Sequence, residues 1–459
     1  MASRTIGVSE IFETSRFTAY QYLICSLCFL VVVFDGYDQT TAGVALPKIA
    51  DYLRAKPSAL GLALGIGQIG PAIGAFVLGP LSDRFGRKRM IILSGLIFAV
   101  FTGLIVTITR VEHLAIFRFL AGVGLGGAVP SALTYGSEYA SSRLRTTIIA
   151  TMYAGIPAGA MVCSLSAAWL IPHYGWQSLF ALGAAIPIII CFVMMVFLPE
   201  SLAFLFTHSN VDKIRIRKII SKISPELASD KEVEFVSDAK KVHGSPVKYL
   251  FIEGRTLTTI VWWIICLLST YMVFILVFWA TTLLHNSGAT VQQYTFGLAA
   301  VMLGNIIAAI FIGRLMDKIN PLRVLQVGFV LAFIALTVFG LAASVHSLLV
   351  IVITSFACGL FINGAQAGAV AAATTAYPSS IRGTGIGWTY AMVKISGILA
   401  PMVGGFLLGM HWSVIQICFR QALIGLFIAA LLLVMQGHLA RAARDNKASE
   451  MGLETAVGR

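Results

Sequence analysis

The chain has 459 residues, of which 58% are hydrophobic and only 12% are charged. Soluble domains average about 25% charged residues, so this chain lacks the polar surface that a soluble fold of its size needs. Its hydrophobicity excludes a disordered chain, and its 43 glycines follow no collagen period. The net charge of +13 does not indicate a nucleic-acid partner, because the basic residues cluster in short segments between apolar runs. The composition therefore predicts an integral membrane protein that lies in a lipid bilayer.

Apolar runs long enough to cross a membrane recur along the whole chain. A spanning helix needs about 20 apolar residues, and the sequence contains twelve such runs. We therefore predict an all-α membrane protein with twelve transmembrane helices in two six-helix pseudo-symmetric bundles. In chain order, the predicted spans are 18–46, 58–82, 89–109, 112–137, 146–170, 177–198, 257–284, 290–315, 321–344, 347–375, 383–409 and 414–437.

A long polar connection separates the first six runs from the last six. It predicts an N-terminal bundle at 1–198, a cytoplasmic connecting loop with short surface helices at 199–256, and a C-terminal bundle with a cytoplasmic tail at 257–459. Lys and Arg concentrate in the segments that share one side of the membrane with both termini. Cytoplasmic loops carry this excess of positive charge, so both termini are predicted to be cytoplasmic.

Two short patterns occur once in each half, at nearly the same spacing. GPLSDRFGRKR at 79–89 is matched by GRLMDK at 313–318, and YASSRLRT at 139–146 is matched by YPSSIRGT at 377–384. A duplicated six-helix unit is typical of a transporter whose substrate site lies between the two repeats.

These motifs resemble the major facilitator superfamily. The segment at 79–89 resembles the signature of its loop between spans 2 and 3, RFLAGVG at 118–124 resembles its span 4 signature, and LPES at 198–201 is usual at the end of span 6. The resemblance covers roughly residues 15–440. It implies a transporter that works by alternating access. Because one chain suffices for this mechanism, we predict a functional monomer.

A narrower resemblance is carried by FDGYD at 34–38 and by YPSSIRGTGIGW at 377–388. Both are similar to the aromatic acid:proton symporter family. This resemblance implies proton-driven import of a benzoate or hydroxybenzoate for aromatic hydrocarbon catabolism, across a bacterial inner membrane. The family usually has Arg within span 11, where this chain has Lys394. Because an ammonium lacks the bidentate fork of a guanidinium, the substrate's identity stays open.

Ionisable residues inside a span indicate function, because they are costly to insert into lipid. Asp35 and Asp38 lie one short step apart on one helix, and two close carboxylates favour protonation of at least one. We predict that they couple transport to protons; the alternative is a static pair that anchors Arg118. Arg118 is expected at the depth of Asp38 and is predicted to pair with it and to bind the substrate. Lys394 is predicted to bind the substrate anion; the alternative is a snorkelling or deprotonated lysine.

Other polar and aromatic residues at mid-span are candidates for the substrate site, although each is also compatible with packing or an interhelical hydrogen bond. They are Gln68, Tyr271, Asn305, Asn363, Gln366, Trp388 and Tyr390. Charged residues and a glycine in the repeated motifs are candidates for a cytoplasmic gate. Gly79 is expected to let two spans approach, and Asp83 to pair with Arg87 or with a basic residue of the other half. The gate candidates are Gly79, Asp83, Arg87, Glu138, Asp317 and Arg382.

No set of residues indicates catalysis, a metal site or a cofactor. The predicted partners are a small organic anion and protons, and the predicted activity is symport and not enzymatic. The alternative is a transporter for another organic anion, a sugar or a drug, including an antiporter. The P-E-T-K-G motif of sugar porters is absent, and GIPAG at 155–159 only partly matches the glycine–proline motif of antiporters.

Overall fold

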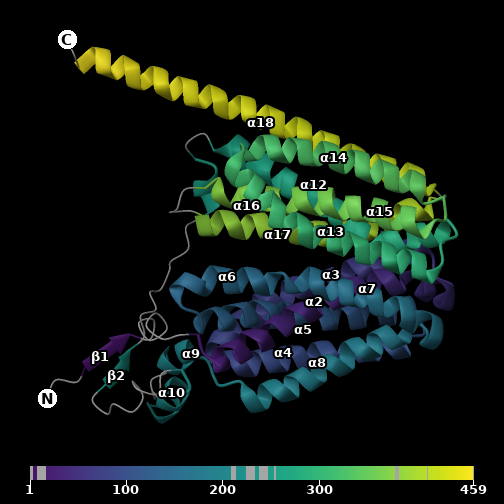
Figure 1. Ribbon diagram of the computed structural model, residues 1–459, viewed down its shortest axis with the longest axis horizontal. Coiled ribbons are helices and arrows are strands. Elements are labelled where there is room, and N and C mark those ends of the chain that lie inside the picture. Colours follow the sequence, from purple (N-terminus) through teal and green to yellow (C-terminus); the bar gives the residue numbers. More distant parts are fainter. Residues whose placement is uncertain are drawn as a thin grey trace. The chain divides into compact units, whose positions relative to one another are not determined.

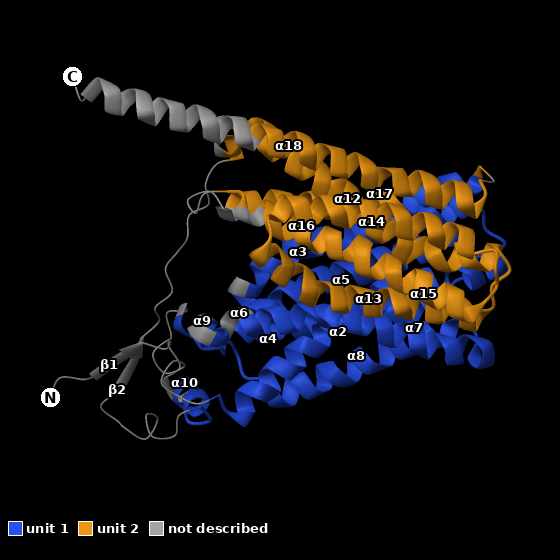
Figure 2. Ribbon diagram, turned by 45° about the horizontal axis from the view of Figure 1, so that its top comes forward, with its two compact units in different colours: residues 1–243, 401–409 blue, residues 244–400, 410–459 orange. Residues whose placement is uncertain are grey.

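The computed structural model describes residues 4–7, 17–207, 213–223, 233–236, 247–252, 255–377, 382–410 and 412–457. Almost all of this part is helical. Twelve of the described helical segments are long and apolar enough to cross a membrane, which confirms the twelve predicted spans. Two compact units divide the chain, at residues 1–243 with 401–409 and at residues 244–400 with 410–459 (Figure 2).

The first unit is built from antiparallel helices that follow one another along the chain (Figure 1). Its described helical elements are α2 Ala19–Leu53, α3 Pro57–Phe85, α4 Arg87–Leu104, the 3-10 turn η1 Ile105–Thr107, α5 Val111–Glu138, α6 Ser142–Tyr153, α7 Gly155–Tyr174, α8 Gln177–Phe197, α9 Leu202–Thr207 and α10 Lys213–Ile220.

The second unit begins with the short turn η2 and ends with a helix that runs beyond its candidate span. Its helical elements are η2 Val247–Leu250, α12 Thr256–Asn286, α13 Val291–Lys318, α14 Pro321–Ala342, α15 Leu348–Cys358, the π-helical segment η3 Gly359–Asn363, α16 Gly364–Thr375, α17 Arg382–Gly409, whose last nine residues are grouped with the first unit, and α18 Val414–Val457.

Side-chain capping boxes mark the starts of α2 and α13. Thr18 precedes α2, where its hydroxyl accepts from the backbone N–H of Gln21, and Gln21 returns a bond to the Thr18 backbone. The same capping box joins Thr290 and Gln293 at α13. A cap satisfies backbone N–H groups that have no partner inside the helix. These residues therefore explain where α2 and α13 start.

The predicted end of the first span at residue 46 is wrong. Helix α2 continues through Pro47 to Leu53, and it ends where Arg54 takes a left-handed conformation with φ of 48°. Proline removes one backbone hydrogen bond, but stopping the helix inside lipid would expose many more unpaired backbone groups. The helix therefore persists to a cap at its end.

Glycines allow neighbouring helices of the first unit to approach closely. A Cβ at Gly36 of α2 would collide with the backbone of Ile156, and one at Gly159 of α7 would collide with the carbonyl of Val33. In lipid, helix association depends on close packing, and small residues permit it. Glycines therefore set the distance between α2 and α7.

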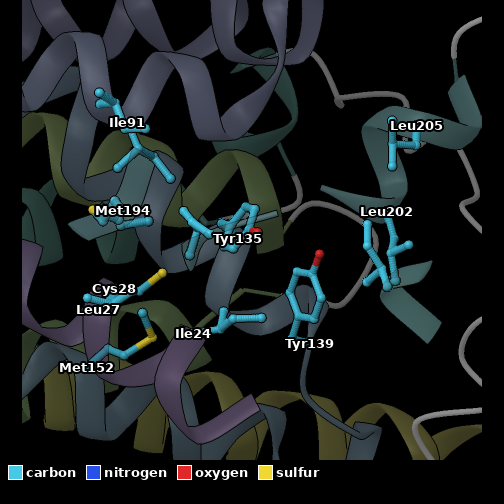
Figure 3. Close-up of a cluster of buried hydrophobic side chains, with 14 of the residues drawn as sticks. Ile24, Leu27, Cys28, Ile91, Tyr135, Tyr139, Met152, Met194, Leu202 and Leu205 are labelled. Atoms are coloured by element: carbon cyan, nitrogen blue, oxygen red, sulfur yellow. The ribbon is translucent and has the colours of Figure 1, made fainter. Parts of the chain in front are cut away.

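A buried cluster fills one end of the first unit (Figure 3). Ile24 and Cys28 of α2 lie there with Tyr135 of α5 and with Tyr139, which follows α5. Leu202 of α9 joins the same cluster, together with isoleucines of α10. The predicted surface helices of the connection are present, but their apolar faces are packed against the bundle.

The structure adds one element that periodicity did not predict. Strand β1 (Arg4–Gly7) pairs in parallel with β2 (Val233–Val236), so that Arg4 lies opposite Val233. Both strands belong to the first unit and are only four residues long. Strands this short have too few residues to show a clear alternation of apolar and polar positions in the sequence.

Replacing Gly159 with alanine should lower the free energy of unfolding by about 1–3 kcal/mol, since the methyl group forces α7 away from α2. Thermal unfolding of the detergent-solubilised protein measures the change. Gly437→Ala is the matched control, because a Cβ there would meet open space. Equal melting temperatures of the two variants would contradict the packing account.

Candidate functional site

The predicted ion pair between the first and fourth spans is present in the first unit. Arg118 of α5 donates from Nη1 to Oδ1 of Asp38 on α2 at 2.6 Å, and Nη1 also lies 3.4 Å from the Asp38 backbone oxygen. The side chains are only 4% and 6% exposed. Removing one partner from such a buried pair costs about 3–5 kcal/mol, because the other charge is left uncompensated.

A seam of glycines positions Arg118 against α3. A Cβ at Gly67 would lie 3.0 Å from the Cβ of Arg118, and a Cβ at Gly70 would collide with the carbonyl of Phe119. From the other side, a Cβ at Gly122 would lie 2.6 Å from Pro71 Cδ. These glycines bring α3 and α5 into backbone contact, so they hold the guanidinium at a fixed depth.

Helix α2 is fixed on the side of Asp38 by two further contacts. The hydroxyl of Tyr37 donates to the carbonyl of Leu179 on α8 at 3.2 Å. Thr41 lies one turn later, and its hydroxyl donates to the Tyr37 carbonyl at 2.8 Å and lies 3.2 Å from Cys163 Sγ on α7. These contacts hold α2 against α7 and α8 beside Asp38. Asp35 is half-buried one turn earlier on α2, and its coupling role stays a prediction.

The ion pair leaves the Nε donor of Arg118 unused. Its Nε is buried and has no hydrogen-bond partner in the part of the chain that the structure describes. An unpaired buried donor is costly unless an acceptor reaches it. The guanidinium therefore has capacity for a second carboxylate oxygen, which its planar fork suits. Gln68, on the neighbouring α3, is half-buried.

In the second unit, Lys394 is an exposed cation within the candidate span of α17. Tyr390 precedes it by one helical turn and is 42% exposed, so both lie on one face of α17. Trp388 stacks on Trp263 of α12, with ring centroids 5.3 Å apart and planes 19° apart. Its ring therefore packs against another helix, and Lys394 and Tyr390 remain the stronger ligand candidates.

Two amides of the second unit, Gln366 and Gln421, form hydrogen bonds between helices. Gln366 of α16 donates to the hydroxyl of Thr270 on α12 at 3.1 Å. Gln421 of α18 donates to the hydroxyl of Tyr271 at 3.1 Å. The packing alternative for Gln366 and Tyr271 is thus present in the structure, whereas their substrate role stays a prediction.

Asn363 differs from the other amides of this unit. It is 3% exposed, and its Nδ2 has no hydrogen-bond partner among the described residues. It also ends the π-helical segment η3, a distortion that is frequent at functional sites. Asn305 of α13 is half-buried. Asn363 is therefore a buried amide with an unused donor among the described residues.

A charged cluster joins the ends of α4, α5 and α8. Arg87 forms an ion pair with Glu138, and Glu138 also accepts from the hydroxyl of Ser201 at 2.5 Å. Glu200 caps α4, since its Oε1 accepts from the backbone N–H of Lys88 and of Ser201, each at 3.0 Å. The motifs at 79–89 and 198–201 therefore meet in space.

Gly86 allows this cap to form. Its φ is 101°, which favours glycine, and a Cβ there would lie 2.6 Å from Glu200 Oε2. The hydroxyl of Tyr139 donates to the Glu200 carbonyl at 3.2 Å. Burial raises the pKa of Tyr139 above its ordinary value, so the phenol remains a donor. Sequence reasoning missed the role of Gly86, although a glycine between two predicted helices was a usable signal.

The remaining gate candidates have different outcomes. The side chains of Asp83 and Arg382 lie outside the described residues, and Asp317 is exposed. A Cβ at Gly79 would meet nothing within 4 Å, so a close approach of two spans does not explain this glycine.

Sequence reasoning also missed Ser201, Thr270 and Gln421 as hydrogen-bond partners, because nothing in the chain indicates which polar residues of different helices meet.

Comparison with known proteins adds to this geometry. The model of the Major Facilitator Superfamily matches residues 28–288 and 261–455. The chain belongs to this superfamily. Its fold is also that of the D-xylose-proton symporter, with a TM-score of 0.69, 14% sequence identity, and coverage of 90% of this chain and 97% of that chain. The protein is therefore a multi-pass integral membrane transporter and not an enzyme.

Two similar relatives are transporters of aromatic acids. The 4-hydroxybenzoate transporter of Acinetobacter baylyi is 33% identical over 89% of this chain and 90% of the relative. The gallate transporter of Pseudomonas putida is 29% identical over 94% of this chain and 95% of the relative. The predicted resemblance to aromatic acid transporters is confirmed.

A double-mutant cycle tests the ion pair. Asp38→Asn should destabilise the solubilised protein by about 3–5 kcal/mol, since it leaves Arg118 buried without its counter-charge. Asp38→Asn combined with Arg118→Met should recover much of the loss, because it removes both charges. Thermal unfolding of the two single variants and the double variant measures the coupling. If the stability losses of the two single variants simply added up in the double variant, the result would contradict a stabilising ion pair.

Proposed function

We propose that the protein is a proton-coupled symporter that imports an aromatic carboxylate, such as a benzoate or a hydroxybenzoate, by alternating access. The names of the relatives support the substrate class, since 4-hydroxybenzoate and gallate are both hydroxylated benzoates. The observation that carries the coupling mechanism is the buried pair of Asp38 and Arg118.

The pair links proton binding to anion binding because the buried guanidinium of Arg118 needs a counter-charge. Protonation of Asp38 removes the negative charge that compensates Arg118 and leaves a buried cation, at a cost of about 3–5 kcal/mol. A substrate carboxylate that reaches the guanidinium restores the balance. The transporter therefore takes up the proton and the anion together, and either one alone is unfavourable. Asp35 lies one turn away and modulates the proton affinity of Asp38 through its own charge.

Residues of the second unit complete the proposed substrate site. Lys394 attracts the carboxylate as a single point charge, and Tyr390 on the same helix face stacks on the ring. The unused amide donor of Asn363 binds a ring hydroxyl or a carboxylate oxygen. The remaining members of the proposed site orient the substrate by hydrogen bonds and packing; they are Gln68, Tyr271, Asn305, Gln366 and Trp388.

The cytoplasmic gate of the proposal centres on the Arg87–Glu138 pair and its bond to Ser201. Breaking these contacts frees the ends of α4 and α5 to move when the transporter opens inward. The other gate candidates of the proposal are Asp83, Asp317 and Arg382.

The proposal also covers the cellular setting. It places the six-helix bundles at 1–198 and 257–459, joined by the cytoplasmic connection 199–256. It also places the protein in a bacterial inner membrane as a functional monomer with both termini in the cytoplasm. The support is the concentration of Lys and Arg in segments that share one side with the termini.

Uptake of labelled 4-hydroxybenzoate and benzoate into cells that express the chain tests the proposed function. A protonophore should abolish uptake. Asp38→Asn should reduce it on the order of 100-fold, because uncoupling a pair worth about 3 kcal/mol corresponds to two powers of ten. Asp35→Asn should give a smaller loss. Glu112→Gln, an exposed acid at the start of α5, should leave uptake unchanged.

Uptake that is indifferent to both the protonophore and Asp38→Asn would disprove the coupling mechanism. Absence of uptake of either acid, with the protein present in the membrane, would disprove the substrate class and leave the transporter fold intact.

Substitution of Lys394 tests the proposed anion contact. Lys394→Gln should raise KM for 4-hydroxybenzoate about 10- to 100-fold, since a hydrogen bond to a charged group is worth about 1.5–3 kcal/mol. Lys394→Arg should retain most of the affinity. Arg420→Gln is the control, because that guanidinium lies 3.8 Å above the Trp412 ring and has no proposed role. An unchanged KM in Lys394→Gln would contradict the contact.

A further inference from the structure

A basic pocket of about 410 Å³ lies in the first unit, where the ends of α4 and α8 meet α10. One acidic residue, Glu200, also lines it. The acid is already engaged as the cap of α4, so the basic side chains determine the charge of the pocket. They are Lys88, Arg89, Arg215, Lys218 and Lys222.

Helix α10 has two faces that explain this arrangement. Ile216, Ile219 and Ile220 repeat at helical spacing and are buried in the apolar cluster that also contains Leu202. Arg215 and Lys218 lie on another face of the same helix and are exposed. The apolar face therefore anchors α10 to the bundle while the basic face lines the pocket.

The other basic residues are also held in place. The Nζ of Lys88 donates to the carbonyl of Met195 on α8 at 2.8 Å, which uses one of its three donors. The Nζ of Lys222 lies 4.6 Å from the ring centroid of Tyr20. Arg89 is exposed beside Lys88. The pocket thus presents cationic donors from two structurally fixed elements.

An apolar groove of about 370 Å³ adjoins the basic pocket and shares Lys88 and Arg89 with it. Its remaining lining is Ile92, Leu93, Leu96 and Met195. These four residues lie within the candidate spans of α4 and α8. Leu93 is 49% exposed and Met195 is 41% exposed, so the groove is open to lipid.

We propose that the pocket and the groove together form a binding site for one anionic phospholipid. The phosphate and headgroup occupy the basic pocket, and an acyl chain lies along the groove. Basic pockets at the end of transmembrane helices suit anionic headgroups. A free phosphate would use the pocket alone, whereas continuity with a lipid-level apolar groove favours the lipid. The bound lipid holds α10, part of the connection between the units, against α4 and α8.

Native mass spectrometry of the full-length protein tests this proposal. The protein is titrated with phosphatidylglycerol or with phosphatidylcholine of the same acyl chains, and separately with inorganic phosphate. Wild type should retain phosphatidylglycerol in preference to phosphatidylcholine. Arg215→Gln/Lys218→Gln/Lys222→Gln should weaken retention about 100-fold, since each basic residue near an anionic headgroup contributes about fivefold.

The charge-matched control is Arg54→Gln/Lys56→Gln/Arg110→Gln. It removes three exposed basic residues at the opposite ends of the helices and should retain the lipid as wild type does. Leu93→Gln/Leu96→Gln should weaken retention of phosphatidylglycerol but not of inorganic phosphate. Equal retention of both lipids, or equal loss in the two triple variants, would overturn the proposal. Full displacement of the lipid by inorganic phosphate would assign the pocket to the free anion instead.

Discussion

A buried cation in lipid must have a counter-charge, and the contact of Arg118 with Asp38 satisfies this requirement in the first unit. The neighbouring helices are arranged around it. Glycines such as Gly67 bring α3 against α5 beside Arg118, and the bond of Tyr37 to α8 fixes α2 beside Asp38. Breaking this pair costs much free energy, because it leaves a buried charge without a partner. When Asp38 is protonated, another anion must therefore compensate the charge of Arg118. In the proposed mechanism, the contact that stabilises the fold also couples proton binding to anion binding.

The end of the first unit shows a second use of charge. Glu200 satisfies the backbone of α4 at Lys88, while Glu138 pairs with Arg87 and bonds Ser201. These contacts connect motifs that are more than 100 residues apart in the sequence. The side chains of Arg87 and Glu138 are each 16% exposed, against 4% and 6% for the buried pair, so water weakens their contact more. This makes the Arg87–Glu138 pair the better candidate to open and close. The proposal therefore assigns coupling to the buried pair and gating to this cluster.

The sequence was sufficient for the number of spans and for the Asp38–Arg118 pair, because hydropathy and matched depth are local properties of each helix. It failed where the outcome depends on neighbours. Helix α2 passes through Pro47 since lipid favours an unbroken helix. Glu138 pairs with Arg87 because α4 and α5 meet there, which the motif at 79–89 does not reveal. The π-helical segment before Asn363 and the short strand pair leave no distinct periodicity. For Gln366 and Tyr271 the sequence left a substrate role and an interhelical hydrogen bond both open; the structure shows the hydrogen bonds, and the substrate role stays a prediction.

The measurement that tests the central claim most directly is proton uptake when substrate binds. Purified protein in weakly buffered detergent solution near pH 7 is mixed with 4-hydroxybenzoate, and the change in bulk pH is recorded. The account predicts that the protein takes up a proton as the anion binds, and that Asp38→Asn abolishes this uptake. Binding of the anion without proton uptake, or with the same uptake in Asp38→Asn, would contradict the account.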